Sequence, residues 1–285
     1  MHINAYYNGV FTNRDEVRIS LTDRGVFFGD GIYDAAIGAN GKIFMLDDHV
    51  DRFFTNAKTL DIPVSMTKDE LKSILLFLAG TSPHKCYFVY FQLTRFSEER
   101  VHSYPDTSRS NLLVTVTDQE PPHLNKRLKL TLAKDIRHEM CNVKTLNLIP
   151  SIIASHKAAT QGCDEAVLHR NGTVTECAHS NVHIVSNGVI ITHPLDNHIL
   201  PGISRKHMLS VCKRLGISVI ERAFSVYELY KADEVLVSSS SKLVAIAERV
   251  DNISFPTVEN GVGERICCEM LSDFIKFTKN NTTNC

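Results

Sequence analysis

Two consecutive prolines near the middle of the 285-residue chain place the strongest constraint on its fold. They lie in the polar segment 119–124, which begins Gln119-Glu120-Pro121-Pro122-His123. A proline has a fixed φ and no backbone N–H, so two in succession interrupt any helix or central strand. A chain of this length suits one large domain or two modest ones. We therefore expect a smaller N-terminal domain over 1–118, a linker over 119–124 and a larger C-terminal domain over 125–285.

Both parts of the chain mix strand and helix patterns. In the first part, the apolar segments 86–94 and 112–116 are typical of strands. Apolar residues recur at helical spacing over 50–60, with Asp47 or Asp48 as the expected N-cap, and again over 71–78. In the second part, strands are expected at 128–132, 165–169, 189–192 and 235–237, and helices after Asn147, from about Ser204 and over 262–277. The predicted fold class is α+β in two domains.

Composition and charge argue against several functional classes. With 43% apolar and 22% charged residues, the chain has the composition of an ordinary globular protein. A net charge of -1 would attract neither nucleic acid nor an anionic membrane, so we expect neither partner. No apolar run approaches the ~18 residues that span a bilayer, and no signal peptide is evident. The eight cysteines include no Cys-x-x-Cys pair, which favours free thiols in a reducing cytoplasm.

Thirteen histidines raise the question of a metal site. His179 and His183 have the spacing H-x-x-x-H, but no glutamate follows the first, so the zinc-protease motif is absent. Their stretch is β-rich, and in a strand two residues four apart are too distant to bind one ion. We therefore expect no metal site.

One lysine and one glutamate are candidates for cofactor chemistry. Lys144 lies in Cys141-Asn142-Val143-Lys144-Thr145-Leu146-Asn147, and Glu176 ends the segment 173–176. A lysine amine can form a Schiff base with an aldehyde, and a carboxylate can hold a pyridinium nitrogen protonated. A pyridoxal phosphate (PLP) enzyme needs both groups. Taken singly, however, each residue is more typical of a solvated position at the end or edge of a strand.

The motifs around these two residues resemble those of the fold-type IV PLP enzymes, the branched-chain and D-amino-acid aminotransferase family. They are K-T-L-N at 144–147, A-V-L-H-R-N-G-T-V-T-E at 166–176 and S-N-V at 180–182. The resemblance extends from residue 24 to residue 241 and so covers most of the chain. It implies that the C-terminal domain binds the cofactor, that the cofactor lies in the cleft between the domains, and that the protein is a homodimer.

The resemblance also implies roles for individual residues. Lys144 would bind the PLP aldehyde and carry the proton between the substrate and the cofactor, and Glu176 would pair with the ring nitrogen. Arg52 is similar to the family's phosphate-binding arginine, whose guanidinium matches the paired oxygens of a phosphate. Further phosphate contacts are expected from a helix start and from a serine-rich loop, at Ile203, Ser204, Ser239 and Ser240.

The chain departs from the family pattern in two places. Cys177-Ala178-His179 replaces a run of small residues that often follows the glutamate, and Asp34 stands after Tyr33 where a glutamate is common. The first change alters the hydrogen bonds and packing available beside Glu176. The second leaves the role of Asp34 open.

The substrate class is indicated by Arg100-Val101-His102. Arg100 and His102 are two residues apart in an extended segment, so they point to the same side and can hold one carboxylate. Tyr33 would add a hydroxyl. The D-amino-acid branch of the family carries this Arg-x-His pair, and the L-branched-chain branch generally does not. The resemblance thus implies transfer of the amino group of D-amino acids such as D-alanine to a 2-oxo acid. The expected acceptor is 2-oxoglutarate, and the products from D-alanine would be pyruvate and D-glutamate.

Three alternatives stay open. An L-branched-chain aminotransferase and an aminodeoxychorismate lyase would have the same fold, and the lyase could keep every cofactor-binding residue. The Arg-x-His pair disfavours both. A non-catalytic PLP-binding protein is disfavoured by the complete set of Lys144, Glu176, Arg52 and Tyr33.

Overall fold

The computed structural model describes residues 3–104, 106, 108–124 and 127–279. Contacts between residues divide the chain into two compact units. Unit 1 comprises Met1–Pro121, Val143–Asn147 and Phe274–Cys285, and unit 2 comprises Pro122–Asn142 and Leu148–Asp273. The chain first leaves unit 1 between the two prolines of the segment 119–124. The units differ from the predicted domain limits in two places, because Val143–Asn147 and the residues from Phe274 onward group with unit 1.

In the described part of the chain, unit 1 is built on a six-stranded antiparallel sheet in the order β2-β1-β6-β5-β3-β4. The strands are β1 (Ala5–Tyr7), β2 (Val10–Thr12), β3 (Gly31–Ala39), β4 (Lys42–Ile43), β5 (Cys86–Thr94) and β6 (Asn111–Asp118). The helices are the 3-10 helix η1 (Arg14–Glu16), α1 (Arg24–Phe28), α2 (Leu46–Thr59) and α3 (Lys68–Thr81). The strands and helices predicted for this part are confirmed.

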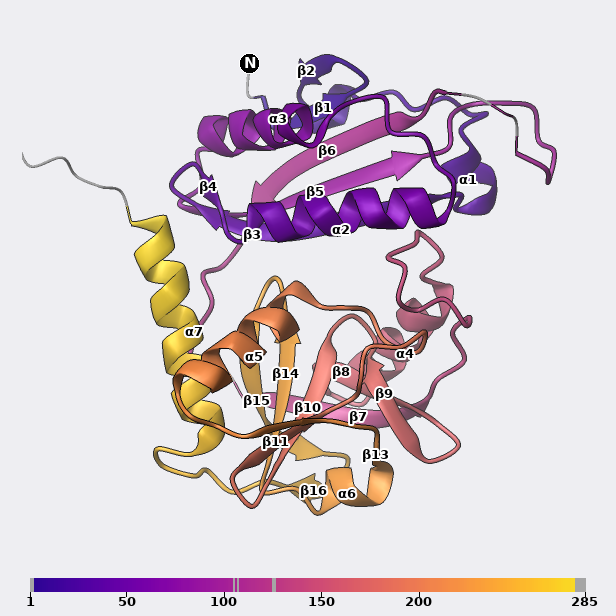
Figure 1. Ribbon diagram of the computed structural model, residues 1–285. Coiled ribbons are helices and arrows are strands. Elements are labelled where there is room, and N and C mark those ends of the chain that lie inside the picture. The colour runs from indigo at the N-terminus through magenta and orange to yellow at the C-terminus, as the bar shows by residue number, and fades with distance from the viewer. Residues whose placement is uncertain (1–2, 105, 107, 125–126, 280–285) are drawn as a thin grey trace, which may run out of the picture. The chain divides into compact units, whose positions relative to one another are not determined.

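The core of unit 1 lies between the sheet and the helices α2 and α3 (Figure 1). Strand β5 contributes Val89 and Phe91, α2 contributes Phe53 and α3 contributes Leu75, all fully buried. The rings of Phe53 and Phe91 meet with centroids 4.9 Å apart. Each such side chain contributes roughly 1.5–3 kcal/mol by leaving water. The core therefore fixes α2 on strand β3, which carries candidate site residues.

Helix α2 begins earlier than the sequence pattern indicates. Its N-cap is Met45, which has a left-handed backbone and makes no side-chain cap bond. The prediction that Asp47 or Asp48 caps the helix is wrong, because both lie inside its first turn. They still interact favourably there with the positive end of the helix dipole.

In the described part of the chain, unit 2 is built on a ten-stranded sheet in the order β12-β11-β10-β14-β15-β7-β8-β9-β13, with β16 paired to β15. The strands are β7 (Leu128–Lys134), β8 (Glu165–Arg170), β9 (Thr173–Cys177), β10 (Asn181–Ser186), β11 (Val189–Thr192), β12 (Val219–Glu221), β13 (Phe224–Ser225), β14 (Glu234–Ser239), β15 (Leu243–Val250) and β16 (Ile253–Ser254). The helices are α4 (Ile149–Thr160), α5 (Ile203–Arg214), α6 (Val226–Tyr230) and α7 (Val262–Thr278). All strands and helices predicted for this part are confirmed.

Strands β10 and β14 form the middle of the unit 2 core. Val182 and Ile184 of β10 and Val235 and Val237 of β14 are buried in one hydrophobic cluster. His183 lies between the two β10 residues and is fully buried, with Nδ1 2.8 Å from the Thr192 Oγ1 and Nε2 2.9 Å from the Ser238 Oγ. Burial, reinforced by the nearby Arg205, lowers the pKa of His183 to about 3. Its imidazole is therefore a neutral link between strands.

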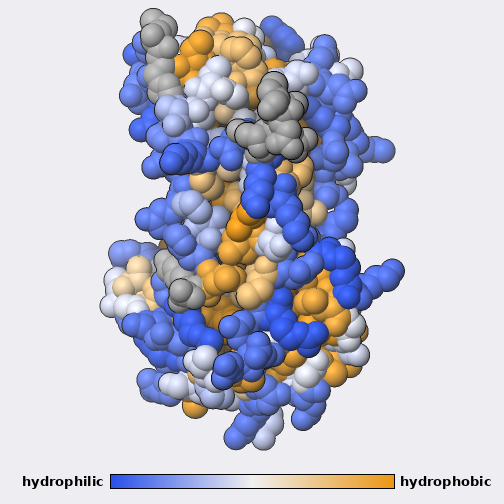
Figure 2. All heavy atoms as spheres, turned by 90° about the vertical axis from the view of Figure 1, so that its left-hand side faces the viewer, coloured by the Kyte–Doolittle hydropathy of each residue, from blue (hydrophilic) through white to orange (hydrophobic). Residues whose placement is uncertain are grey.

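The two units together give the α+β class that the sequence predicts. On the face drawn in Figure 2, hydrophilic residues cover most of the surface, and hydrophobic residues lie exposed in smaller areas between them. No helix in the described ranges is long and apolar enough to cross a membrane. A cofactor cleft between the domains stays a prediction.

Candidate active site

Lys144 is held against the beginning of strand β3 by its own segment, Val143–Asn147. Thr145 pairs with Ile32 in an isolated β-bridge, and the Tyr33 N–H donates to the Lys144 carbonyl oxygen at 3.0 Å. The Lys144 side chain is half-buried, and its Nζ lies 4.3 Å from the centroid of the Tyr33 ring. Backbone hydrogen bonds thus bring the predicted Schiff-base lysine and the predicted substrate-binding tyrosine together.

Asn147, the last residue of the K-T-L-N motif, is bound to the end of helix α1. Its Nδ2 donates to the Gly29 carbonyl oxygen at 3.1 Å. Gly29 ends helix α1 with a φ of 63°, a left-handed conformation that strongly favours glycine. A Cβ at Gly29 would also lie 3.1 Å from the Asn147 Oδ1. The glycine-rich segment before β3 and the lysine motif are therefore in direct contact.

Asp34, His49 and Arg52 form a buried charged group, the Asp34 cluster, between β3 and α2. Successive residues of a strand point to opposite faces, so Asp34 faces α2 whereas Tyr33 faces away from it. The Asp34 carboxylate accepts hydrogen bonds from the Arg52 Nε and Nη2, both at 2.8 Å. It also lies 2.7 Å from the His49 Nδ1. This two-point pairing fixes the orientation of the guanidinium.

The charges of the Asp34 cluster are strongly coupled. Burial alone would raise the pKa of Asp34, but Arg52 and His49 outweigh it and hold that pKa well below its usual range. Burial lowers the pKa of His49, against the opposite effect of Asp34, and the charges of Arg52 and Lys144 lower it further. The effect of Lys144 on His49 means that the amine is within electrostatic reach of the cluster. The sequence did not indicate that Arg52 is engaged by Asp34.

Arg100 and His102 lie at helix α1. Both side chains contact the ring of Phe28: the Arg100 Cζ is 5.1 Å and the His102 ring centroid 5.5 Å from its centroid. Arg24 donates to the carbonyl oxygens of residues 101 and 102 at 2.8 and 3.3 Å, which anchors the backbone of this exposed segment. Both side chains therefore lie beside the Phe28 ring. No contact within the described residues joins either of them to Lys144.

In unit 2, Glu176 of strand β9 is held by several donors. Arg137 donates to its Oε1, and the Asn181 Nδ2 and the Leu200 N–H donate to its Oε2 at 2.9 and 3.0 Å. The side chain is only 5% exposed. Hydrogen bonds from N–H donors favour the ionised form of a carboxyl group. The arrangement therefore provides an oriented, buried carboxylate of the kind that pairs with a protonated ring nitrogen.

Arg137 is a residue of this site that the sequence analysis missed. Its guanidinium donates to both oxygens of Asp135 at 2.9 Å and to the His198 carbonyl oxygen at 3.0 Å. Burial would lower the pKa of Arg137, but Asp135 and Glu176 outweigh it and raise that pKa, so the guanidinium stays charged. The sequence did contain one signal for this residue. Asp135 and Arg137 carry opposite charges and come directly after the predicted strand that forms β7.

Asn181 connects Glu176 with the start of helix α5. Its Nδ2 also donates to the Leu200 carbonyl oxygen at 3.0 Å. A Cβ at Gly202 would lie 2.0 Å from the Asn181 Oδ1, so only glycine fits there. Gly202 is the N-cap of α5 and provides no side-chain cap, and the first turn begins with the buried Ile203 and Ser204. Backbone N–H groups at a helix start suit a phosphate.

Strand pairing brings Ser239 and Ser240 to the same end of the sheet. Asn181 pairs with Ser238, so the turn that follows β14 lies beside the start of β10. The Ser239 Oγ accepts from the Lys242 N–H at 3.3 Å, which closes this turn. Around Asn181, unit 2 thus gathers Glu176 and the predicted phosphate-binding residues Ile203, Ser204, Ser239 and Ser240.

The tripeptide Cys177-Ala178-His179 forms a turn between β9 and β10. The Cys177 N–H donates to the Ser180 carbonyl oxygen at 2.7 Å. The fully buried Glu165 accepts from the Ser180 Oγ at 2.6 Å and from the His179 N–H at 3.1 Å. The half-exposed imidazole of His179 also lies 3.1 Å from Glu165. Of the three residues that depart from the family pattern, His179 is therefore engaged with Glu165.

Both sets of residues fit the chemistry of PLP. Unit 1 provides a half-buried amine, Lys144, beside Tyr33 and close to a buried guanidinium. Unit 2 provides the Glu176 carboxylate, and beside it a helix start whose N-cap, Gly202, offers no competing side chain. An aldehyde, a pyridine nitrogen and a phosphate each find a matching group in these sets.

Sequence comparison finds related proteins over most of the chain. A family model described as amino-transferase class IV matches residues 31–250. The D-alanine aminotransferase of Listeria monocytogenes serotype 4b (strain F2365) is 34% identical over 259 residues, which cover 89% of this chain and 90% of that protein. The D-alanine aminotransferase of Staphylococcus aureus (strain MSSA476) is 32% identical over 280 residues, which cover 97% of this chain and 98% of that protein.

Solved structures show the same fold with other activities. The branched-chain amino acid aminotransferase of Escherichia coli superposes with a TM-score of 0.88 at 20% identity, covering 99% of this chain and 97% of that chain. A putative 4-amino-4-deoxychorismate lyase from Legionella pneumophila gives a TM-score of 0.82 at 21% identity, covering 93% and 97%. At these identities the likeness concerns the fold alone.

Asp34→Asn is expected to destabilise the protein by about 3–5 kcal/mol, because it removes the buried carboxylate charge that pairs with the Arg52 guanidinium. Since the pKa of Asp34 is lowered on folding, its stabilising effect is complete above the ordinary carboxyl pKa of about 4 and is lost as the pH falls through the folded-state value. Denaturant unfolding should therefore show a smaller difference between the two proteins at pH 3 than at pH 7.

The matched control is Asp47→Asn, which removes an exposed carboxylate that pairs with Lys72 on the surface. It should change the free energy of unfolding by less than about 1 kcal/mol. Equal losses in the two variants would contradict a special role for the Asp34 cluster.

Proposed function

The chain belongs to the class IV aminotransferases, so it is a transaminase that uses pyridoxal 5'-phosphate, and we propose that its amino donors are D-amino acids. D-Alanine is the proposed donor and 2-oxoglutarate the proposed acceptor, which gives pyruvate and D-glutamate. The Arg100–His102 pair carries this proposal, and the observation that supports it is that both side chains lie beside the Phe28 ring. The D-alanine aminotransferases that align with nearly the whole chain support it further.

Lys144 is proposed as the catalytic residue. When bound, PLP supplies an electron sink for the charge left on the substrate Cα after its proton departs. The Lys144 Nζ would bind the cofactor's aldehyde carbon and, once the substrate amine replaces it, hold the proton taken from Cα. Two observations support this role: the backbone of Lys144 is bound by the Tyr33 N–H, and its Nζ lies 4.3 Å from the centroid of the Tyr33 ring.

Glu176 is proposed to hold a proton on the ring nitrogen of the cofactor. The donors Arg137, Asn181 and the Leu200 N–H hold its carboxylate in a fixed orientation. An ionised carboxylate favours the protonated ring, and a protonated ring is the stronger electron sink. We propose Arg137 as a positioning residue, which acts through Glu176.

Five residues are proposed to bind the phosphate of the cofactor. In unit 2 the supporting observation is the helix start at Gly202, which has no side-chain cap. In unit 1 it is the guanidinium that Asp34 holds through Nε and Nη2. The proposed set is Arg52, Ile203, Ser204, Ser239 and Ser240.

Arg100 and His102 are proposed to hold the substrate carboxylate together with the Tyr33 hydroxyl. The protein is proposed to be a homodimer in which Arg100 and His102 of one subunit contribute to the site of the other. An apolar helix face supports the homodimer. Ile149, Ile152 and Ile153 on α4 are 67%, 57% and 40% exposed, and covering them would remove apolar surface from water.

A reducing cytoplasm is the proposed location, because the seven cysteines of the described residues are free thiols.

Lys144→Ala should abolish the long-wavelength absorbance of lysine-bound PLP, because the amine that binds the aldehyde is lost. Borohydride reduction of the unmodified protein, followed by peptide mapping, should place the pyridoxyl group on Lys144. Lys58→Ala, which removes an exposed lysine of α2, serves as the control and should keep the absorbance. A label on any other lysine would overturn the assignment.

Glu176→Gln should leave PLP bound but slow the first half-reaction in single-turnover experiments. The amide carries no charge, so the pairing with the ring nitrogen weakens by ~1.5–3 kcal/mol, or about ten- to a hundredfold in rate. Glu234→Gln is the matched control. Glu234 is also a buried glutamate, but it lies at the start of β14, whereas Ser238, which pairs with Asn181, lies near the end of that strand. An unchanged rate in Glu176→Gln would remove Glu176 from its role.

D-Alanine, D-glutamate and D-aspartate should be good donors with 2-oxoglutarate, and L-leucine and L-valine should be poor ones. Arg100→Ala should lower kcat/KM for D-alanine about ten- to a hundredfold, because a charge-assisted pair worth ~1.5–3 kcal/mol is lost. The control is Arg109→Ala, which removes an arginine that stacks on Phe96 in the same region. L-Valine transamination without D-alanine activity would favour a branched-chain enzyme, and lyase activity without transamination would favour the lyase.

Mixing the subunits of two variants tests the homodimer part of the proposal. A dimer of one Lys144→Ala chain and one Arg100→Ala chain has one site with both residues intact only if Arg100 serves the partner's site. Activity should therefore reappear on mixing. Its failure to do so, in mixtures shown to contain the mixed dimer, would place Arg100 in the site of its own chain.

A further inference from the structure

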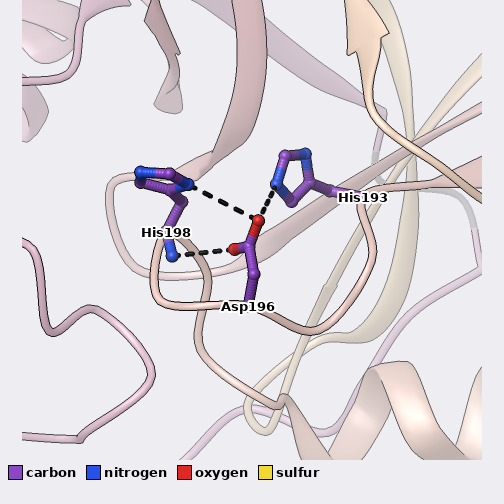
Figure 3. A group of neighbouring side chains, drawn as sticks. All are labelled: His193, Asp196 and His198. Carbon is purple, nitrogen blue, oxygen red and sulfur yellow. Dashed lines mark hydrogen bonds and ion pairs between the residues drawn. The ribbon is translucent and has the colours of Figure 1, made fainter.

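We propose that His193, Asp196 and His198 form a binding site for a divalent metal ion of the zinc type. The three residues lie between strand β11 and helix α5 of unit 2, in a segment with the pattern H-x-x-D-x-H. Figure 3 shows their side chains pointing toward one another. One potential ligand atom from each residue lies within 4.8 Å of those of the other two. The prediction of no metal site considered a different histidine pair.

The spacing of the ligand atoms matches what one small ion requires. The Asp196 Oδ2 lies 3.0 Å from the His193 Nε2 and 3.4 Å from the His198 Nδ1. Two ligands that are each about 2.0–2.1 Å from a tetrahedral zinc ion lie about 3.3 Å apart. An ion could therefore enter among the three atoms if the two imidazole nitrogens, which lie within 4.8 Å of each other, close around it.

The ligands are also oriented for coordination. The His198 N–H donates to the Asp196 Oδ1 at 2.8 Å, which turns Oδ2 toward the imidazoles. On the outer side of His198, the Nε2 lies 3.4 Å from the Glu139 Oε2. A histidine that binds metal through one nitrogen commonly donates the other N–H to a carboxylate, and this contact also raises the basicity of the ligating nitrogen.

The segment that carries these ligands is fixed at both ends. The His193 carbonyl oxygen accepts from the Arg205 Nη2 at 2.8 Å, and the His198 carbonyl oxygen accepts from the Arg137 Nη2 at 3.0 Å. The His193 side chain is 5% exposed, whereas those of Asp196 and His198 are about one-third exposed. A metal ion could thus reach the site from solvent and find the ligands already arranged.

The ligand types select the kind of ion. Two imidazoles and one carboxylate suit Zn²⁺, Co²⁺ or Ni²⁺, whereas Ca²⁺ and Mg²⁺ prefer oxygen ligands alone. Three protein ligands leave a fourth position of a tetrahedral ion to water. The ion would also tighten the segment that supplies the His198 carbonyl oxygen to Arg137 and the Leu200 N–H to Glu176.

Calorimetric titration of the metal-free holoenzyme with Zn²⁺, and separately with Co²⁺, tests the proposal. The unmodified protein should bind about one ion per chain at this site. Asp196→Asn keeps an oxygen for the His198 N–H but loses the charge, and His198→Gln loses a ligand. Each should weaken binding at least tenfold. His123→Gln removes an exposed histidine of the same unit and should leave binding unchanged.

Two further measurements keep the result decisive. Bound Co²⁺ should give visible absorption bands of nitrogen and oxygen ligation, and these bands should be absent in His198→Gln. PLP absorbance and the unfolding midpoint without metal show whether each variant is folded. Hydrogen bonds already link the three side chains without an ion. The absence of binding by the unmodified protein, or unweakened affinity in folded Asp196→Asn and His198→Gln, would therefore overturn the proposal.

Discussion

The site depends first on the backbone pairing that attaches the lysine segment to strand β3. The chain leaves unit 2 at Val143, forms a bridge between Thr145 and Ile32, and returns to unit 2 after Asn147. A segment this short is held in place only if both of its ends are bound. Val143 is buried in the core of unit 1, and the Asn147 side chain donates a hydrogen bond to the Gly29 carbonyl oxygen. The backbone of Lys144 is thus set by main-chain bonds, and its amine lies 4.3 Å from the centroid of the Tyr33 ring.

Both units use a buried carboxylate held by an arginine. Asp34 holds Arg52 in unit 1, and Glu176 and Asp135 hold Arg137 in unit 2. Such pairs are weak evidence for stability, because desolvation offsets most of the attraction and well-packed apolar residues often do as well. Removing one partner is nevertheless severe, since an uncompensated charge remains buried. The clusters therefore make most sense as devices that keep charged groups in fixed orientations for the chemistry of the site.

The sequence predicted the elements well and the contacts between distant residues poorly. Strand β5 was predicted from its nearly continuous apolar run, and helix α7 from apolar residues at helical spacing. The family was recognised because the short motifs around Lys144 and Glu176 are specific. Arg137 was missed because its link to Glu176 follows from the strand order β7-β8-β9, which no local pattern reveals. The triad of His193, Asp196 and His198 was missed for a related reason, since a loop has no fixed period and its ligand spacing appears only on folding.

Chemistry and specificity are under different physical constraints in this chain. Lys144, Arg52 and Glu176 are tied to strands and to buried partners, so a change at any of them disturbs the core as well as the site. Arg100 and His102 lie on an exposed segment and touch mainly the ring of Phe28, so they can change at little cost to stability. Solved structures with the same fold are described as a branched-chain aminotransferase and as a lyase. Under the proposed function, the choice of enantiomer would therefore depend on the exposed Arg100 and His102, and the cofactor on residues that are tied to strands and buried partners.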